Sequence, residues 1–337
     1  MSVQGGKAWK QMVLSSLPPV EWVQNLGRNR EVVLSSRVRI MRNLRTHHFP
    51  QTASNHELEL IRNKILKANE LASDPLHLFT GMTLAERNYF VACRLISPQF
   101  AWQRDGRALF LDTKRSLSLM VNEEDHIRMQ AVIGGWSISE AKKLAENKLE
   151  GLARNLQFAH MSEFGYLAAS PLNCGEGRRL SAMVHLVGLA HTKRLPQLLK
   201  ALSAQGISAR GLFGEGSRAI GAFAQISAIS GSLSQFIGAC EYLIGQETQA
   251  RESCSLSEVK SQWQTACNLA LSQRSISLAN ALRIMSWTRF AASLNITSSS
   301  IGLRETDLML TRLELTDGDT IDDQESRVLD LRKFLGL

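Results

Sequence analysis

The pattern of apolar and polar positions switches repeatedly between strand-like runs and helix-like spacing. Short apolar runs at residues 108–112 and 117–121 flank a polar stretch at 113–116, which predicts a β-hairpin. Leu58, Ile61 and Ile65 recur at three- and four-residue spacing, which predicts an amphipathic helix that ends near residue 73. Strands and helices are therefore expected to alternate along the chain, although patterning alone does not give their topology.

Helix starts are marked by a serine or threonine followed three residues later by glutamate, the spacing of a capping box. These pairs are Ser54 with Glu57, Thr83 with Glu86, and Ser137 with Glu140. Short apolar runs predict further strands at residues 32–34, 164–169 and 207–213. The first of these strands would deliver the arginine-rich block that follows it.

The pattern is almost wholly helical from about residue 234, with breaks near residues 253–257, 272–275 and 297–300. We therefore expect a leader at 1–31, broken by Pro18 and Pro19, a central domain at 32–252 and a helical domain at 253–337. Residues 314–325 are acidic and contain no lysine or arginine, which predicts a solvated loop.

Composition narrows the class of protein. The 337 residues can bury a sizeable core, and we find neither a signal peptide nor a run of ~20 apolar residues that would span a membrane. The five cysteines show no C-x-x-C spacing, which argues against a disulfide framework and a structural zinc site. We expect free thiols in a cytoplasmic enzyme.

The net charge of +8 would suit an acidic partner. Residues 28–45 contain six arginines and no lysine, a choice that favours forked recognition of phosphate groups over a diffuse basic surface. General nucleic-acid binding is therefore disfavoured.

Three short blocks combine arginine with a carboxylate or a glycine turn. They are Ser-Ser-Arg-Val-Arg at 35–39, Asn-Glu-Glu-Asp-His-Ile-Arg at 122–128, and Arg-Gly-Leu-Phe-Gly-Glu-Gly at 210–216. Such an inventory can hold a triphosphate and activate a basic nucleophile, which points to phosphoryl transfer.

Together these blocks resemble the catalytic domain of the phosphagen (ATP:guanidino) kinases, most closely the bacterial protein arginine kinases, from about residue 32 to 252. The resemblance implies an α+β, glutamine synthetase-like fold with a curved, mainly antiparallel sheet flanked by helices. A C-terminal helical domain would follow. It also implies ATP as phosphoryl donor and magnesium held through the ATP phosphates.

The resemblance implies that ATP is bound by three segments and two further arginines. They are Ser35, Ser36, Arg37, Val38 and Arg39; Arg179, Leu180, Ser181, Ala182 and Met183; Arg210, Gly211, Leu212, Phe213, Gly214 and Glu215; and Arg94 and Arg128. Five of these arginines, at positions 37, 39, 128, 179 and 210, match the family's phosphate clamp. Arg94 stands where the family usually has histidine.

Glu124 matches the family's catalytic carboxylate, which would act as general base, and Glu215 matches the second carboxylate that orients the guanidinium. Both glutamates could instead pair with neighbouring arginines in a buried network. Glu123 and Asp125 are interpreted as supporting residues. His126 could be either a hydrogen-bonded core residue or a catalytic one, and His185, within an apolar run, is interpreted as core.

The chain departs from the family on the acceptor side. A family cysteine opens a Cys-Pro-Thr-Asn segment, whereas this chain has Ser170 at that position and Cys174 four residues later. Serine has no accessible anion at neutral pH, so the electrostatic help of a thiolate is lost unless Cys174 replaces it. A lower rate, another acceptor or a nucleotide-binding pseudokinase would each follow from this change.

We therefore predict an ATP-dependent protein arginine kinase, because the arginine blocks begin at residue 35 without the helical domain that covers small guanidino substrates in other branches. The alternatives are a regulator that binds nucleotide or phosphoarginine without turnover, and a kinase of free arginine or another small guanidino compound. The resemblance further implies protein substrates that bear arginine, a McsA-like activator, a Clp-type protease system and a homodimer, with no membrane partner.

Overall fold

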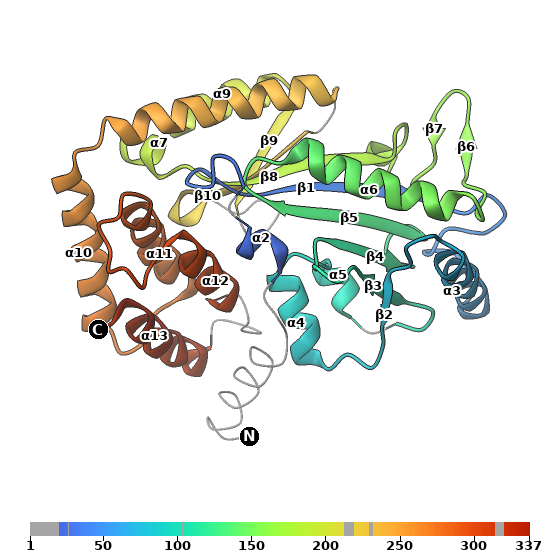
Figure 1. Cartoon of the computed structure of the whole chain (residues 1–337), viewed down its shortest axis with the longest axis horizontal. Helices are drawn as coiled ribbons and strands as arrows, with labels where there is room; N and C mark the ends of the chain where they lie inside the picture. Colours follow the sequence, from blue (N-terminus) through green and yellow to red (C-terminus); the bar gives the residue numbers. More distant parts are fainter. Residues whose placement is uncertain (1–19, 26, 103, 212–218, 229–231, 314–319) are drawn as a thin grey trace. The chain divides into compact units, whose positions relative to one another are not determined.

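A computed structural model describes residues 20–25, 27–102, 104–211, 219–228, 232–313 and 320–337 (Figure 1). The chain divides into two compact units. Unit 1 takes its described residues from Met1–Ser35, Gly134–Trp136 and Ala182–Leu337, and unit 2 from Ser36–Ile133 and Ser137–Ser181. Each unit is therefore built from segments that are far apart in the sequence.

Unit 2 is organised on a sheet with the hydrogen-bonded strand order β2-β3-β4-β5-β1-β8. The pairs β2–β3, β3–β4 and β4–β5 are antiparallel. The strands are β1 (Val33–Arg42), β2 (His77–Phe79), β3 (Ala108–Leu111), β4 (Leu117–Val121), β5 (Ile127–Gly134) and β8 (Arg178–His185), with a separate hairpin of β6 (His160–Met161) and β7 (Gly165–Tyr166). The predicted hairpin at 108–121 is confirmed as β3–β4.

Helices accompany this sheet, and two of them, α3 and α6, pack against each other. Leu58, Ile61 and Ile65 are fully buried on α3, as their spacing predicts. The helices of unit 2 are α3 (Asn55–Glu70), α4 (Leu84–Ala92), α5 (Pro98–Ala101) and α6 (Ile138–Ala153), followed by the 3-10 turn η1 (Pro171–Asn173).

Unit 1 contains the strand order β8-β10-β9, with β9 and β10 antiparallel, and most of the helices (Figure 1). Residues 182–185 of β8 belong to unit 1, and the earlier residues of that strand belong to unit 2. The complete strands of unit 1 are β9 (Ile207–Gly211) and β10 (Phe223–Ala228). Its helices are α2 (Glu21–Gln24), α7 (Val187–His191), α8 (Leu195–Ala204), the 3-10 turn η2 (Ile220–Ala222), α9 (Leu233–Glu252), α10 (Leu256–Ser272), α11 (Leu278–Ser293), α12 (Leu303–Leu313) and α13 (Ile321–Leu335).

Several local predictions are corrected by the structure. The first strand does not stop at residue 34 but continues to Arg42, because Val38 and Ile40 keep the two-residue alternation of buried positions. Ser54 caps α3, but the Glu57 carboxylate binds the backbone and ring of His48 instead of closing a capping box. The strand predicted at 164–169 is only Gly165–Tyr166.

The acidic stretch at 314–325 is also only partly a loop. Residues 321–325 form the first turn of α13, capped by the Thr320 hydroxyl. Asp322 and Asp323 are favourable there because carboxylates stabilise the positive end of a helix dipole. The rest of the stretch, residues 314–319, lies outside the described residues, as do residues 1–19 of the expected leader.

A buried ionic network in unit 1 fixes the segment that leads into β1. Asp307 on α12 accepts from Arg30 at 2.8 Å and from Arg289 at 2.8 Å, and all three side chains are buried. Arg289 also donates to the carbonyl oxygens of Arg30 and Glu31, both at 2.6 Å. One carboxylate thus joins two helices to the chain just before β1.

We expect Asp307→Ala to lower the free energy of unfolding by about 3–5 kcal/mol, because it leaves two buried guanidinium groups without their carboxylate. The control is Glu59→Ala, which breaks the partly exposed Arg62–Glu59 pair and should cost less than about 1 kcal/mol. Urea denaturation measures both variants. Equal losses would show that the buried network does not stabilise unit 1.

Candidate active site

Five arginine side chains of unit 2 form what we call the arginine cluster: Arg37, Arg39, Arg94, Arg128 and Arg179. Arg37 and Arg39 lie two residues apart on β1, which places both on one face of the strand. Arg128 and Arg179 come from β5 and β8, the two neighbours of β1 in the sheet. Arg94 follows α4 with a left-handed backbone, φ 61°.

The cluster concentrates positive charge. Burial, followed by the charges of Arg128 and Arg94, lowers the pKa of Arg37 to about 9. Burial and the charges of Arg37, Arg128 and Arg179 hold the pKa of Arg39 well below its usual range, although Glu123 opposes this effect. Burial is the larger cause of both shifts, and the neighbouring guanidinium charges add to it, so the cluster favours an anion.

Some hydrogen-bond donors of the arginine cluster have no acceptor among the described residues. Arg37 donates from Nε to the Ser181 hydroxyl at 3.1 Å, and Arg128 donates to Glu123 at 2.7 Å. The Nε atoms of Arg39, Arg128 and Arg179 are buried and have no hydrogen-bond partner in the described part of the chain. Buried donors are normally satisfied, so a ligand rich in acceptor oxygens fits this face.

The turn between β4 and β5 carries Glu123, Glu124 and Asp125. It starts at Asn122, whose backbone has a positive φ of 55° and whose side-chain amide donates to the carbonyl oxygens of Leu58 and Gly106. Gly106 has φ 75°, and a Cβ there would lie 2.7 Å from the Leu58 Cβ. Only glycine lets the backbone at position 106 come this close to Leu58 of α3. The Asn122 amide, which binds both carbonyls, thus anchors the start of the turn on α3.

Two further side chains hold the end of the turn. The Asn43 amide oxygen accepts from the His126 backbone, and its NH2 group donates to Asp125 at 2.6 Å. Burial lowers the pKa of His126 to about 4, so its neutral ring accepts from the Leu44 backbone at Nδ1 and contacts the His48 carbonyl through Nε2. Of the two readings of His126, the structure supports the hydrogen-bonded core residue.

The carboxylates of Glu123 and Glu124 have different environments. Glu123 is buried and binds Arg128 and the Ser97 hydroxyl; burial favours its neutral form, but Arg128 and the hydrogen bonds outweigh this, and its pKa is lowered. Glu124 is exposed, and desolvation together with Asp125 and Glu123 raises its pKa. Among described residues, the Glu124 carboxylate has no hydrogen bond or ion pair, so it can receive a ligand.

The structure brings together only part of the predicted site. Arg37, Arg39, Arg94, Arg128, Arg179, Ser181 and Glu124 all lie in unit 2. Arg210 and Gly211 lie on β9 of unit 1, where they pair with Gln225 and Ala224. Leu212, Phe213, Gly214 and Glu215 are outside the described residues.

Six other residues predicted to bind ATP have buried side chains: Ser35, Ser36, Val38, Leu180, Ala182 and Met183. The Ser36 hydroxyl accepts from the Ser137 backbone. Sequence patterning did not identify Asn43 or Ser97, which position the turn and Glu123, because nothing in their local sequence distinguishes them from other polar residues.

Comparisons with known proteins agree on one family. The family model described as "ATP:guanido phosphotransferase, C-terminal catalytic domain" matches residues 58–249, more than half of the chain. The chain belongs to the ATP:guanido phosphotransferase family. A protein-arginine kinase of Halothermothrix orenii is 38% identical over 209 residues, 61% of this chain and 60% of that protein. Another, from Shouchella clausii, is 31% identical over 305 residues, 86% of this chain and 85% of that protein.

Solved structures show the same fold. The duplicated taurocyamine kinase of Schistosoma mansoni matches with a TM-score of 0.60 at 20% identity, covering 76% of this chain and 42% of that one. A lombricine kinase matches with a TM-score of 0.59 at 20% identity, covering 71% and 73%. The predicted α+β fold, with an antiparallel sheet flanked by helices and further helices towards the C-terminus, is confirmed.

The loop where the family has its cysteine is attached to the turn that carries Glu124. Asp125 accepts from the Ala169 backbone at 2.7 Å, immediately before Ser170. The Cys174 sulfur contacts the Ala168 backbone N–H and carbonyl at 3.4 and 3.7 Å. Within the described residues the Ser170 hydroxyl forms no hydrogen bond, and all five cysteines are free thiols, as their spacing predicts.

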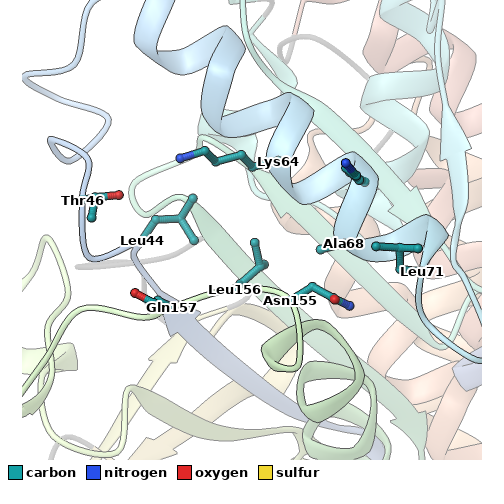
Figure 2. Close-up of a pocket in the computed structure, with 9 residues that line it drawn as sticks. Leu44, Thr46, Lys64, Ala68, Leu71, Asn155, Leu156 and Gln157 are labelled. Carbon is teal, nitrogen blue, oxygen red and sulfur yellow. The ribbon is translucent and has the colours of Figure 1, made fainter.

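A cavity of about 460 Å³ in unit 2 contains none of the predicted site residues. Figure 2 shows Lys64 and Ala68 of α3, with Leu71 just after that helix, on one side of it and Asn155, Leu156 and Gln157 on another. The arginine cluster does not line this cavity, and the candidate site is assigned from its chemistry, not from cavity size. None of the helices described is long and apolar enough to cross a bilayer.

We expect Glu124→Gln and Glu123→Gln to change stability in opposite directions. Folding raises the pKa of Glu124, so removing its charge should stabilise the fold at pH 7, by less than about 1 kcal/mol because the group is exposed to solvent. Folding lowers the pKa of Glu123, so its neutralisation should destabilise the fold at pH 7. Thermal melting of the two variants and the parent measures both effects.

The two effects should shrink as the pH falls. The gain from Glu124→Gln disappears once this carboxyl is protonated in both folded and unfolded chains, and the loss from Glu123→Gln disappears as the pH drops through its lowered folded pKa. Effects of the same sign at pH 7 would contradict the assigned environments.

Proposed function

We propose that this protein transfers the γ-phosphoryl group of ATP to arginine side chains of proteins. The observation that carries the proposal is the exposed Glu124 carboxylate on a rigid turn beside the arginine cluster. Membership of the ATP:guanido phosphotransferase family supports the reaction type. The similarity to protein-arginine kinases, at 31–38% identity, supports a protein arginine side chain as the acceptor.

The arginine cluster would hold the triphosphate. Guanidinium groups from three adjacent strands can bind several phosphate oxygens at once, and they stabilise the charge on the equatorial oxygens during transfer. Arg210 of β9 matches the fifth arginine of the family's clamp and is included in the proposal on that ground alone. Binding of the polyphosphate would also relieve the repulsion that lowers the pKa values of Arg37 and Arg39.

Magnesium fits this site as an ion carried by the nucleotide. Among the described residues, no three histidine, cysteine, aspartate or glutamate side chains are grouped to hold a metal, and magnesium commonly keeps water and phosphate ligands. When bound to the ATP phosphates it would supply further positive charge. The protein's own part is to align the phosphates and to position the carboxylate.

The acceptor needs a base. The pKa of a guanidinium is about 13.8 against about 4.3 for a glutamate, a gap of about 9.5 units or roughly 13 kcal/mol for full deprotonation before attack. Proton transfer is therefore concerted with attack: the nitrogen–phosphorus bond forms, the bond to the β-phosphate oxygen breaks, and the proton passes to Glu124. The raised pKa of Glu124 moves it towards the range of an effective base.

Other parts of the proposal rest on the family alone. Glu215 would be the second carboxylate that orients the guanidinium, and Ser170 and Cys174 would lie on the acceptor side. The domain division at residues 252 and 253, a cytoplasmic location, a homodimer, a McsA-like activator and a Clp-type protease system are proposed on the same ground.

We expect Glu124→Gln to reduce the rate of arginine phosphorylation by about 10²–10⁴-fold while the affinity for ATP changes little, because general-base catalysis is lost and the clamp is kept. The assay incubates the protein with ATP, magnesium and an arginine-rich protein such as casein, beside free arginine, and detects phosphoarginine by mass spectrometry without acid. Glu70→Gln, at an exposed position on α3, is the control. Unchanged phosphorylation would remove Glu124 as the base.

A regulator that binds nucleotide without turnover is the second candidate, and Ser170 is the observation that favours it. Its hydroxyl cannot supply the negative charge of the family's thiolate. If the kinase function holds, Ser170→Cys should raise the rate, by up to about tenfold for ~1.4 kcal/mol of added electrostatic help. Ser170→Ala is the matched control and should leave the rate unchanged.

The same assay separates the candidates. ATP binding with no phosphoarginine on protein or free arginine, in the parent and in Ser170→Cys, would favour the regulator. Product on free arginine alone would reassign the protein to the kinases of small guanidino compounds.

A further inference from the structure

A second cavity of unit 2 has the composition of an anion site and shares no lining residue with the arginine cluster. It has a volume of about 420 Å³, within the range of small-molecule sites. Four arginines line it, Arg62, Arg87, Arg104 and Arg107, and no aspartate or glutamate does. We call it the arginine-lined cavity. Figure 1 shows α4, α5, β2 and β3, which contribute to its wall, close together in unit 2.

Two of the four arginines of this cavity have no carboxylate partner in the described chain. Arg62 pairs with Glu59 on its own helix, at 2.6 Å. Arg87 donates to the Met82 carbonyl and Arg104 to the Pro50 carbonyl, and in the described chain neither has a carboxylate partner. The Glu86 carboxylate beside Arg87 is occupied by Thr83 in the α4 capping box. Two guanidinium groups at one cavity therefore lack a counter-charge.

Several donors in the wall are also unused. The Nε atoms of Arg62 and Arg87 are buried and have no hydrogen-bond partner among the residues described. A guanidinium has five N–H donors, and Arg87 uses one of them in the described chain. The remaining N–H groups of Arg87 are donors that a phosphate oxygen can satisfy.

The remaining wall is apolar and partly aromatic. Phe100 and Leu109 are buried, and Phe79 is held by an edge-to-face contact with Phe90 at 5.4 Å. Arg107 lies over the Phe100 ring, 5.3 Å from its centroid. A bare phosphate ion would leave this surface empty, whereas an aromatic group attached to the phosphate would cover it.

Arg107 connects the cavity to the turn that carries Glu124. Its Nε donates to the Asn122 carbonyl at 3.2 Å, and another nitrogen donates to the carbonyls of Gln99, Phe100 and Trp102. Arg107 also interacts electrostatically with both Arg104 and Glu123. An anion bound beside it would compete for these donors and would shift the backbone at the start of the turn.

We propose that the arginine-lined cavity binds a small organic anion in which a phosphate is attached to an aromatic body, and that Arg107 transmits its binding to the Asn122–Asp125 turn. The binding part is independent of the proposed function, whereas the effect on catalysis rests on it. The arginine-lined cavity would thus regulate the enzyme without overlapping the arginine cluster.

Isothermal titration calorimetry on the full chain tests the binding, with phenyl phosphate as probe and inorganic phosphate as its truncated counterpart. Phenyl phosphate should bind at least tenfold more tightly than inorganic phosphate. Arg87→Met and Arg104→Met should each weaken it at least fivefold; Arg104 is exposed, so its variant keeps the test valid if Arg87→Met fails to fold. Arg154→Met, at an exposed position after α6, is the control and should have no effect.

The variant Arg39→Met tests whether phenyl phosphate binds at the arginine cluster instead of the arginine-lined cavity. This variant should leave the affinity for phenyl phosphate unchanged. Loss of binding in Arg39→Met, or equal affinity in the parent, Arg87→Met and Arg104→Met, would overturn the proposal. In the arginine phosphorylation assay, phenyl phosphate should change the rate of the parent at least twofold and that of Arg104→Met much less. Binding without this change would overturn the transmission through Arg107, and a protein without kinase activity would still show the binding.

Discussion

The candidate site depends on holding like charges together against their own repulsion. Arg37, Arg39, Arg128 and Arg179 come from three neighbouring strands, and burial and mutual repulsion lower the pKa values of the two on β1. A flexible loop would separate such groups, whereas a hydrogen-bonded sheet fixes their backbones. The repulsion is therefore stored in the folded protein and is released when an anion binds, which is how electrostatic preorganisation stabilises charge in a reaction.

The turn that carries Glu123, Glu124 and Asp125 leaves one charged side chain exposed while the residues around it are held in place. Glu123 is committed to Arg128 and Ser97, while Glu124, its neighbour in sequence, is left exposed and without a partner among the described residues. Asn43, Asn122 and His126 take up the backbone and side-chain hydrogen bonds of the turn, so its shape does not depend on Glu124. A reactive group can be displayed in this way because other residues carry the structural work.

The sequence predicted much of this arrangement, and the failures have physical causes. Helices α3 and α4 and the β3–β4 hairpin follow from local spacing and capping, which a chain encodes within a few residues. The family resemblance pointed to Glu124 and the arginines, and the structure places Glu124 and four of the five clamp arginines in unit 2. Local pattern could not show that β1 continues through Arg37 and Arg39, because two charged residues interrupt the apolar run by which a strand is recognised. Asn43 and Ser97 were missed because their partners lie 82 and 26 residues away.

In the loop at Ser170, the groups that fix the backbone are different from the side chain at position 170. The path of the loop is set by backbone hydrogen bonds, such as those between Tyr166 and Gly175, and by the hydrogen bond from the Ala169 N–H to Asp125. The Ser170 hydroxyl forms no hydrogen bond with the residues that the structure describes. In the proposed kinase, a mutation at position 170 would therefore alter the charge offered to an acceptor without disturbing the backbone that presents it. Such a position would be evolutionarily exchangeable: a lineage could retune the reactivity of the enzyme there at little cost to folding, and an engineer could do the same.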